Sequence, residues 1–434
     1  MTASSFLSES SHQGVGGASV QLRRWSWALC IALGLASGLV TFGDARGQSS
    51  SGRSSDAEKD GFVEQMMKDA GIPGLQTVVV KNSHIVWQKS YGQAVLAQPG
   101  PPTPMRDDSI LFACSIGKIV TAVAVMQQVE KGRLSLDDDI NGYVPFVVRN
   151  PKWPNVPITW RMLLTHTSSI NDAEDVQEAV YVYGAASPIR FEEYVEGTFK
   201  PGGIYNRPDS YLHGKPGTER IYSNNGIDLA GYAVARLAHQ PFTTYVNQAI
   251  MSPLGMKETS YSLADLPSNK LAVGYGRTSA PNDHYVFAPN RVAFGHLPAG
   301  RSVMDEQMGL PDAPSGTLYT SAVQFARLVM MLLNRGTLDG VKILEPPSVD
   351  LLLTHSGYWS IYGYQQGLVF FGTRDLDDRL VWGHDGHDRG YCTAVFFDRE
   401  KGVGAIAFAN ANRDDFLLSR RLVDLDLHMM DWFK

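Results

Sequence analysis

Segments typical of β-strands lie at both ends of this chain, and helical segments lie between them. Near the N-terminus, residues 75–80 and 84–89 are rich in β-branched and aromatic side chains, and the short Lys81-Asn82-Ser83 link is typical of a hairpin. The same character returns at 364–371, 380–383, 391–397 and 403–410. Apolar residues at helical spacing occupy the centre, at 115–130, 158–164, 225–238, 242–250 and 321–334.

This order predicts an α+β fold in which the N-terminal hairpin pairs with the C-terminal strands in one antiparallel sheet. Helices at 57–70 and 413–433 would flank that sheet. We expect one domain over residues 57–434, with a sheet lobe at 57–112 and 340–434 and an inserted helical lobe at 113–339. Small-molecule sites tend to lie in the cleft between two such lobes.

The first residues are predicted to direct export. Arg23 and Arg24 precede an apolar run at 25–42, and small and polar residues follow. This pattern is typical of a signal peptide, here over 1–47, followed by a Ser/Gly linker over 48–56. The run is nearly long enough to span a bilayer, so an uncleaved signal anchor remains the alternative. The sequence thus predicts a periplasmic or secreted protein, with membrane contact only through such an anchor.

Charge and cysteine content restrict the partners. The formal net charge is −6 and no Lys/Arg block stands out, which argues against a nucleic-acid partner. If Cys30 leaves with the leader, Cys114 and Cys392 remain. Two buried free thiols are the preferred interpretation, and a disulfide between them stays open.

A first candidate motif is Ser115-Ile116-Gly117-Lys118, at the start of a strongly apolar helical segment. Residues three apart project from one helix face, so the Lys118 amine can reach the Ser115 hydroxyl. Burial and the positive end of the helix dipole both favour the neutral amine. A neutral amine can take the serine proton, which makes Ser115 a candidate nucleophile. The alternative is an N-cap serine followed by a surface lysine.

A second candidate motif is Tyr222-Ser223-Asn224, on a loop before a helix. A phenol near ammonium groups can ionise and serve as a base. The Asn224 amide can hold the lysine and a substrate carbonyl. The alternative is an ordinary capping turn.

A third candidate motif, Gly383-His384-Asp385-Gly386-His387, is predicted to end a strand at 380–382. Gly386 would allow a ligand to approach the backbone, and the amides of His387 and Ser115 would form an oxyanion hole. A metal site built from His384, Asp385, His387 and Asp388 is the rival interpretation. The sequence offers no second ligand cluster at matching spacing, so we predict no metal.

Together these motifs resemble those of the serine β-lactamase and penicillin-binding-protein superfamily, in its class C β-lactamase-like branch. Four further stretches are similar to that branch: Lys131-Gly132-Arg133-Leu134-Ser135-Leu136-Asp137, Leu163-Leu164-Thr165-His166-Thr167-Ser168, Pro216-Gly217-Thr218 and Pro253-Leu254-Gly255-Met256. The resemblance covers about residues 74–410. It implies a β-lactamase/transpeptidase-like fold, a serine hydrolase domain, and no metal or organic cofactor. His166 is expected to pack under a helix without a chemical role.

The resemblance also implies a mechanism. Ser115 would attack an acyl carbonyl with help from Lys118 and Tyr222, and Tyr222 would help water release the acyl-enzyme. Asn224, His384, Asp385 and Gly386 would contact the substrate, which would be a small molecule or a peptide.

Two departures from the family pattern bear on substrate. His384 stands where β-lactamases usually carry lysine, and a neutral imidazole holds a carboxylate less well. Asp385 stands at a hydroxyl position and would repel a carboxylate. We therefore expect weak β-lactamase action and better action on uncharged esters or amine-bearing D-amino-acid amides. The alternative is a catalytically silent relative that binds cell-wall peptides or acts as a scaffold.

Overall fold

The computed structural model describes residues 55–96, 101–173, 176, 179–180, 182–183, 187–277, 285–286, 308–360, 363–412 and 417–433. Residues 53–434 form one compact unit. The predicted leader at 1–47 lies outside the described residues. None of the helices within the described ranges is long and apolar enough to cross a bilayer.

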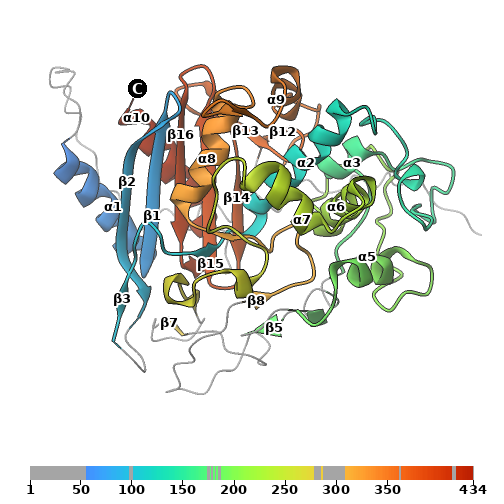
Figure 1. Ribbon diagram of the computed structural model, residues 1–434, viewed down its shortest axis with the longest axis horizontal. Helices are drawn as coiled ribbons and strands as arrows, with labels where there is room; N and C mark the ends of the chain where they lie inside the picture. Colours follow the sequence, from blue (N-terminus) through green and yellow to red (C-terminus); the bar gives the residue numbers. More distant parts are fainter. Residues whose placement is uncertain are drawn as a thin grey trace, which may run out of the picture. The chain divides into compact units, whose positions relative to one another are not determined.

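An antiparallel sheet forms the centre of the domain, with strand order β12-β13-β14-β15-β16-β1-β2-β3 (Figure 1). Its N-terminal strands are β1 (Gly74–Lys81), β2 (His84–Val95) and β3 (Thr103–Pro104). Its C-terminal strands are β12 (Gln365–Gln366), β13 (Phe371–Leu376), β14 (Arg379–Asp388), β15 (Tyr391–Asp398) and β16 (Val403–Ala409). The N-terminal and C-terminal strands meet where Leu75 of β1 pairs with Ala409 of β16. The predicted α+β fold with one antiparallel sheet is confirmed.

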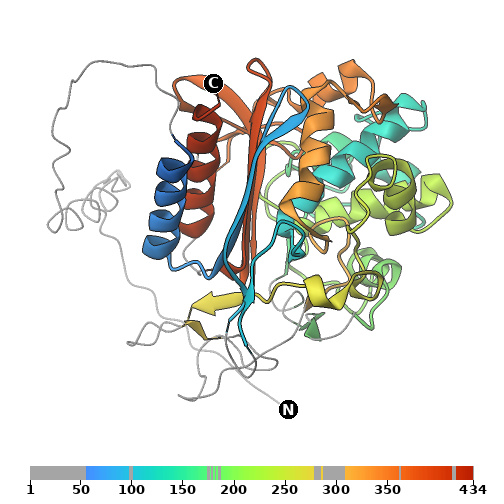
Figure 2. The same cartoon turned by 60° about the vertical axis from the view of Figure 1, so that its left-hand side comes forward.

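Helices cover both faces of this sheet (Figure 2). The terminal helices α1 (Asp56–Ala70) and α10 (Leu417–Asp431) lie together on one face, as predicted. Val63 of α1 and Leu422 of α10 belong to the core on this face. Helix α8 (Ala322–Leu333) covers the other face, where Phe325 lies 6.1 Å from Phe408 between ring centroids. The predicted lobe boundary at residue 339 therefore does not follow the packing, because α8 belongs to the sheet lobe.

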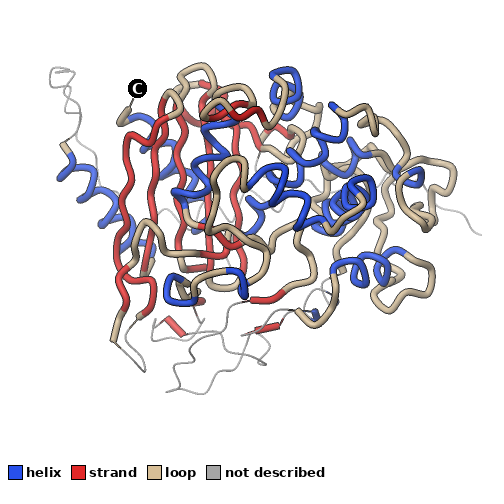
Figure 3. Tube along the Cα trace, in the orientation of Figure 1, coloured by secondary structure: helices blue, strands red, loops and turns tan. Residues whose placement is uncertain are grey.

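The remaining helices gather beside the sheet (Figure 3). They include α2 (Lys118–Glu130), α3 (Trp160–Leu164), α5 (Phe191–Phe199), α6 (Asn224–Ala238), α7 (Phe242–Val246) and α9 (Pro346–Leu352). Most of α2 and α6 is buried, and the two helices pack against each other. A helix that is apolar around most of its surface is stable only when it is enclosed in this way.

Two predicted elements differ from the structure. The strand predicted at 364–371 is interrupted, because Gly367 lies against the Leu352 carbonyl and Val369 takes a left-handed φ of 71°. The helix predicted at 242–250 ends as α7 at Val246 and continues as a π-helical turn, Asn247–Met251.

Candidate active site

Ser115 lies in a short 3-10 helix, Cys114–Gly117, that leads into α2. The sequence predicted that the α-helix begins at Ser115, but regular helix begins at Lys118. Before it, Cys114 takes a left-handed φ of 54°, a conformation that costs a non-glycine residue about 1 kcal/mol or more. The sharp turn leaves Ser115 half-buried at the inner end of the helix. It is thus held in place by backbone on both sides.

Lys118 is fully buried and its Nζ lies 3.0 Å from the Ser115 Oγ. The Ser315 carbonyl accepts a second hydrogen bond from the same nitrogen. The predicted contact between the first two catalytic candidates is therefore present. A buried lysine amine beside a serine hydroxyl is the arrangement that activates a serine nucleophile.

Tyr222 lies beside these two residues, although its hydroxyl does not join their hydrogen bond. The Lys118 Nζ is 4.9 Å from the centroid of the Tyr222 ring. The Tyr222 Oη is buried, and the described part of the chain supplies it with no hydrogen-bond partner. The structure thus brings the three predicted catalytic side chains together, with a hydrogen bond only between Lys118 and Ser115.

Asp172 fixes the second motif, and the sequence analysis did not identify it. Its carboxylate accepts hydrogen bonds from the Ser223 hydroxyl at 2.9 Å, the Asn224 amide at 2.6 Å and the Asn225 amide at 2.9 Å. Burial raises the pKa of Asp172, and these hydrogen bonds act in the opposite direction. The carboxylate also neutralises the positive end of α6. In the sequence, Asp172 stands in a polar segment and at no fixed spacing from Tyr222. The sequence therefore offers little that identifies it as a partner of the second motif.

The third motif lies within β14, which extends beyond the predicted strand at 380–382 and continues through Asp388. A Cβ atom built on Gly386 would lie 2.8 Å from the Ser115 amide nitrogen and 2.9 Å from the Cys114 Cβ. Only glycine fits at this approach. The backbone of the strand therefore lies directly against the start of the serine helix, as an oxyanion hole between Ser115 and His387 requires.

Side chains alternate between the two faces along β14, so His384 and Gly386 share a face while Asp385 points to the other. The Ser419 hydroxyl of α10 hydrogen-bonds the Asp385 carboxyl, and burial raises the pKa of that carboxyl. Asp385 is not among the residues that line the pocket beside Ser115. The prediction that Asp385 faces the substrate is wrong, because the strand extends through residue 388 and fixes its direction.

The same alternation bears on the cysteine and metal interpretations. The Cys392 Sγ lies 3.4 Å from the Ser419 Oγ, on the α10 side, whereas Cys114 adjoins Ser115. Both thiols are buried and free. The four candidate metal ligands of β14 likewise divide between two faces. Across the described residues, no group of three His, Cys, Asp or Glu side chains could hold a metal ion.

His384 is buried on the side of the sheet that faces Tyr222. Its ring stacks on Phe371 at 4.3 Å and lies 6.2 Å from the Tyr222 ring between centroids. Burial, together with the nearby charge of Lys118, lowers the pKa of His384 to about 3. The Nδ1 atom contacts the Asp385 carbonyl, which can only accept, so the proton resides on Nδ1. Nε2 then carries a lone pair, and no described residue donates a hydrogen bond to it.

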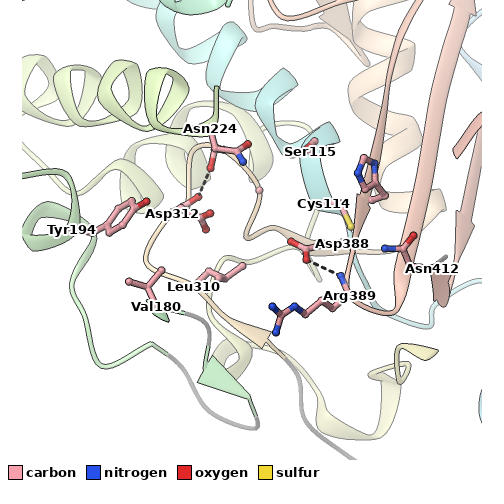
Figure 4. A pocket seen from close by; sticks show the side chains of 13 residues that line it. Cys114, Ser115, Val180, Tyr194, Asn224, Leu310, Asp312, Asp388, Arg389 and Asn412 are labelled. Atoms are coloured by element: carbon pink, nitrogen blue, oxygen red, sulfur yellow. Dashed lines mark hydrogen bonds between the residues drawn. The ribbon is translucent and has the colours of Figure 1, made fainter. Parts of the chain in front are cut away.

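A pocket of about 250 Å³ opens beside Ser115 (Figure 4). Ser115, Asn224 and His387 line it, whereas the other predicted site residues, Lys118, Tyr222, His384, Asp385 and Gly386, do not. Further lining residues come from both lobes: Cys114, Val180, Tyr194, Leu310, Asp312, Ser315, Gly316, Asp388, Arg389 and Asn412.

Acidic groups surround the buried lysine on the helical side of this pocket. The Ser315 hydroxyl donates to Asp228 at 3.2 Å, and Asp312 lies close to both. Burial raises the pKa of Asp228 and of Asp312, while the charge of Lys118 lowers both. Lys118 and these two aspartates therefore interact electrostatically inside the protein.

Comparison with known proteins agrees with this geometry. Residues 60–428 match the sequence model of the Beta-lactamase family. A β-lactamase from Pseudomonas fluorescens is 26% identical over 309 residues, which cover 71% of this chain and 72% of that protein. The Protein flp of Staphylococcus aureus strain N315 is 25% identical over 355 residues, 82% of this chain. That match spans 63% of the length of Protein flp, so this chain covers less than two thirds of that relative.

Solved structures share the fold at lower sequence identity. The D-amino acid amidase of Ochrobactrum anthropi SV3 superposes with a TM-score of 0.65 and 19% identity, over 87% of this chain and 98% of the amidase. A class C β-lactamase from Rhodobacter sphaeroides gives a TM-score of 0.62 and 20% identity, over 86% and 99%. Since the family model spans most of the chain, the chain belongs to the Beta-lactamase family, within the serine β-lactamase and penicillin-binding-protein superfamily that its motifs resemble.

Proposed function

We propose that this protein is a serine hydrolase that forms an acyl-enzyme on Ser115 and cleaves esters or amides. The observation that carries this proposal is the 3.0 Å contact between the buried Lys118 Nζ and the Ser115 Oγ. Removing a lysine from water lowers stability unless contacts inside the protein compensate for it. An amine held this close to a serine hydroxyl can activate that hydroxyl as a nucleophile.

The reaction has two balanced halves. The Ser115 Oγ forms a bond to the acyl carbon while its proton passes to Lys118 or Tyr222. The C–O or C–N bond of the substrate breaks, and that proton goes to the departing alcohol or amine. Water then attacks the acyl-enzyme with Tyr222 as base, and Ser115 recovers its proton. The amides of Ser115 and His387 stabilise the oxyanion in both halves.

His384 favours substrates without a carboxylate at its position. Its imidazole is neutral above about pH 3 and presents a lone pair on Nε2. A lone pair accepts a hydrogen bond from an N–H or O–H group and gives no attraction to an anion. With Asp385 on the other face, this preference rests on His384 alone. A relative of the same fold bears the name EstCE1, a hydrolase with promiscuous acyltransferase activity, which is compatible with ester substrates.

A panel of nitrocefin, a short-chain p-nitrophenyl ester and a D-amino-acid p-nitroanilide tests this proposal, with Ser115→Ala as control. We expect kcat/KM to be highest on the ester or the anilide. His384→Lys should raise kcat/KM on nitrocefin relative to the ester. A wild-type preference for nitrocefin would contradict the substrate assignment.

Labelling with a fluorophosphonate, followed by mass spectrometry of the Ser115 peptide, distinguishes a serine hydrolase from a catalytically silent binding protein. An unlabelled Ser115 in a folded protein that turns over no member of the panel would favour the silent binding protein. The export of the protein through residues 1–47 is also part of the proposal. N-terminal sequencing of the protein recovered from the periplasm or the medium would test it.

A further inference from the structure

His166 contacts three successive residues, Ile221, Tyr222 and Ser223, of which the last two belong to the second motif. Its carbonyl accepts a hydrogen bond from the Ile221 amide at 2.9 Å. Its Nδ1 accepts one from the Ser223 amide at 3.2 Å. Between these two bonds, its ring lies 4.3 Å from the Tyr222 ring between centroids, at an interplanar angle of 31°. One histidine thus holds the backbone on both sides of Tyr222 and one face of its ring.

The backbone of His166 is shaped for this contact. The residue follows α3 and takes a left-handed φ of 56°, a conformation that is uncommon for non-glycine residues and that histidine, like asparagine and aspartate, adopts more often than most. With this backbone, both the carbonyl and the ring face the Tyr222 loop. Packing under a helix, the role expected from the sequence, requires neither feature.

The protonation state of His166 follows from its partners. The Ser223 amide can only donate, so Nδ1 carries the lone pair and Nε2 carries the proton. Burial, assisted by the charges of Arg220 and Lys118 and by His384, lowers the pKa of His166 well below its usual value. The imidazole is therefore neutral across the range in which Ser115 would work. Its Nε2 is buried without a partner in the described ranges, so burial of this nitrogen lowers the stability of the folded protein.

Resting on the proposed function, we infer that His166 is a positioning residue that holds the Tyr222 phenol for proton transfer. The phenol makes no hydrogen bond of its own within the described part of the chain, so its location depends on what holds its ring and backbone. A displacement of about 1 Å of a catalytic group can lower the rate by about a hundredfold. His166 thus acts on the reaction only through Tyr222.

A double-mutant cycle tests this inference, with the rate of Ser115 labelling by a fluorophosphonate and the kcat for a p-nitrophenyl ester as readouts. His166→Gly removes the ring while accepting the left-handed backbone. We expect it to lower both rates about 10- to 100-fold in the wild type, with KM little changed. In the Tyr222→Phe background, the same change should lower them less than about threefold, because the group it positions is gone.

Two further variants serve as controls. His239→Gly removes an exposed imidazole from another left-handed position, at the end of α6, and should leave both rates unchanged. His166→Asn keeps a side-chain oxygen that can accept from the Ser223 amide, and asparagine tolerates the left-handed backbone. It should recover a large part of the lost rate, and it stands in for His166→Gly if that variant does not fold.

The outcomes separate the inference from the proposed function. Equal losses in the wild-type and Tyr222→Phe backgrounds, or no loss in the wild type, would overturn the role of His166 while Ser115 remains the nucleophile. A wild-type protein that is neither labelled nor active would overturn the proposed function, and the inference with it.

Discussion

The Lys118 Nζ lies between the Ser115 hydroxyl, 3.0 Å away, and the Ser315 carbonyl, which fixes it from a second side. The two residues of the first motif are therefore held by a contact to a distant loop as well as by their spacing along the chain. Every prediction about the reaction depends on this arrangement.

Lys118→Met should lower kcat/KM on the ester by about 10³-fold, since it removes the nitrogen that contacts the Ser115 hydroxyl at 3.0 Å. The same substitution should also lower the free energy of unfolding by an amount that depends on pH. The charge of Lys118 lowers the pKa of three buried carboxyls, those of Asp172, Asp228 and Asp312. Without it these pKa values rise further, so the loss of stability should be larger at pH 8 than at pH 5. Urea unfolding at the two pH values measures this. Lys131→Met, at the end of α2, is the control, and an equal loss at both pH values would count against this electrostatic interaction.

Tyr222→Phe should abolish most of the activity while leaving the fold as stable as before or more so. The substitution removes a buried hydroxyl that has no partner in the described residues, and an apolar replacement of such a group is often neutral or stabilising. Tyr261→Phe is a matched control, because its hydroxyl is also buried and unpartnered among the described residues. We expect similar melting temperatures for both variants and a loss of about 10²- to 10⁴-fold in kcat for Tyr222→Phe only. Equal activities would remove Tyr222 from the mechanism.

His384 should make the protein less stable in acid. Its pKa is lowered to about 3 in the folded protein, against about 6.5 when unfolded. Between these values the unfolded chain binds a proton that the folded chain does not, so stability falls as pH drops from about 6.5 toward 3. The slope contributed is up to about 1.4 kcal/mol per pH unit. His384→Gln should flatten that part of the stability curve, and His239→Gln should not. An unchanged slope in His384→Gln would show that this imidazole is not held neutral.

Asp426 should have the opposite dependence. It lies on α10 with no exposed surface, and burial raises its pKa well above the usual value. The unfolded chain loses this proton more readily, so stability is reduced as pH rises above about 4. Asp426→Asn should therefore stabilise the protein at pH 7 and have little effect at pH 3. Asp398→Asn provides the contrast, because Asp398 is buried with the Arg379 guanidinium at 2.9 Å and its loss should destabilise at pH 7. Thermal melting at the two pH values measures both.

The sequence predicted the parts of the fold and site that depend on local pattern. The spacing of Ser115 and Lys118 places both side chains at the start of one helix, and the structure brings them into contact. The hairpin of β1 and β2 and the C-terminal strands follow from alternation and composition, and their pairing in one sheet follows from the order of elements. These features require no information about distant residues.

The remaining features arise from tertiary contacts. The direction of Asp385 depends on how far β14 continues, which pairing with β15 decides. Asp172 reaches the start of α6 from 52 residues away in the sequence. His166 was expected only to pack, and its contacts to the Tyr222 loop become visible once α3 and that loop are adjacent. None of these relations has a fixed spacing in the sequence.

The close approach at Gly386 makes the geometry of the proposed site sensitive to a single methyl group. One added carbon atom at that position would meet the amide nitrogen of Ser115 at 2.8 Å, inside the space that the two backbones share. Gly386→Ala would thus wedge strand and helix apart while every chemically reactive side chain stayed in the chain. A related protein that keeps the serine, lysine and tyrosine but carries a side chain at this position would still match the three motifs. Its strand and serine helix could not approach each other as closely as they do here.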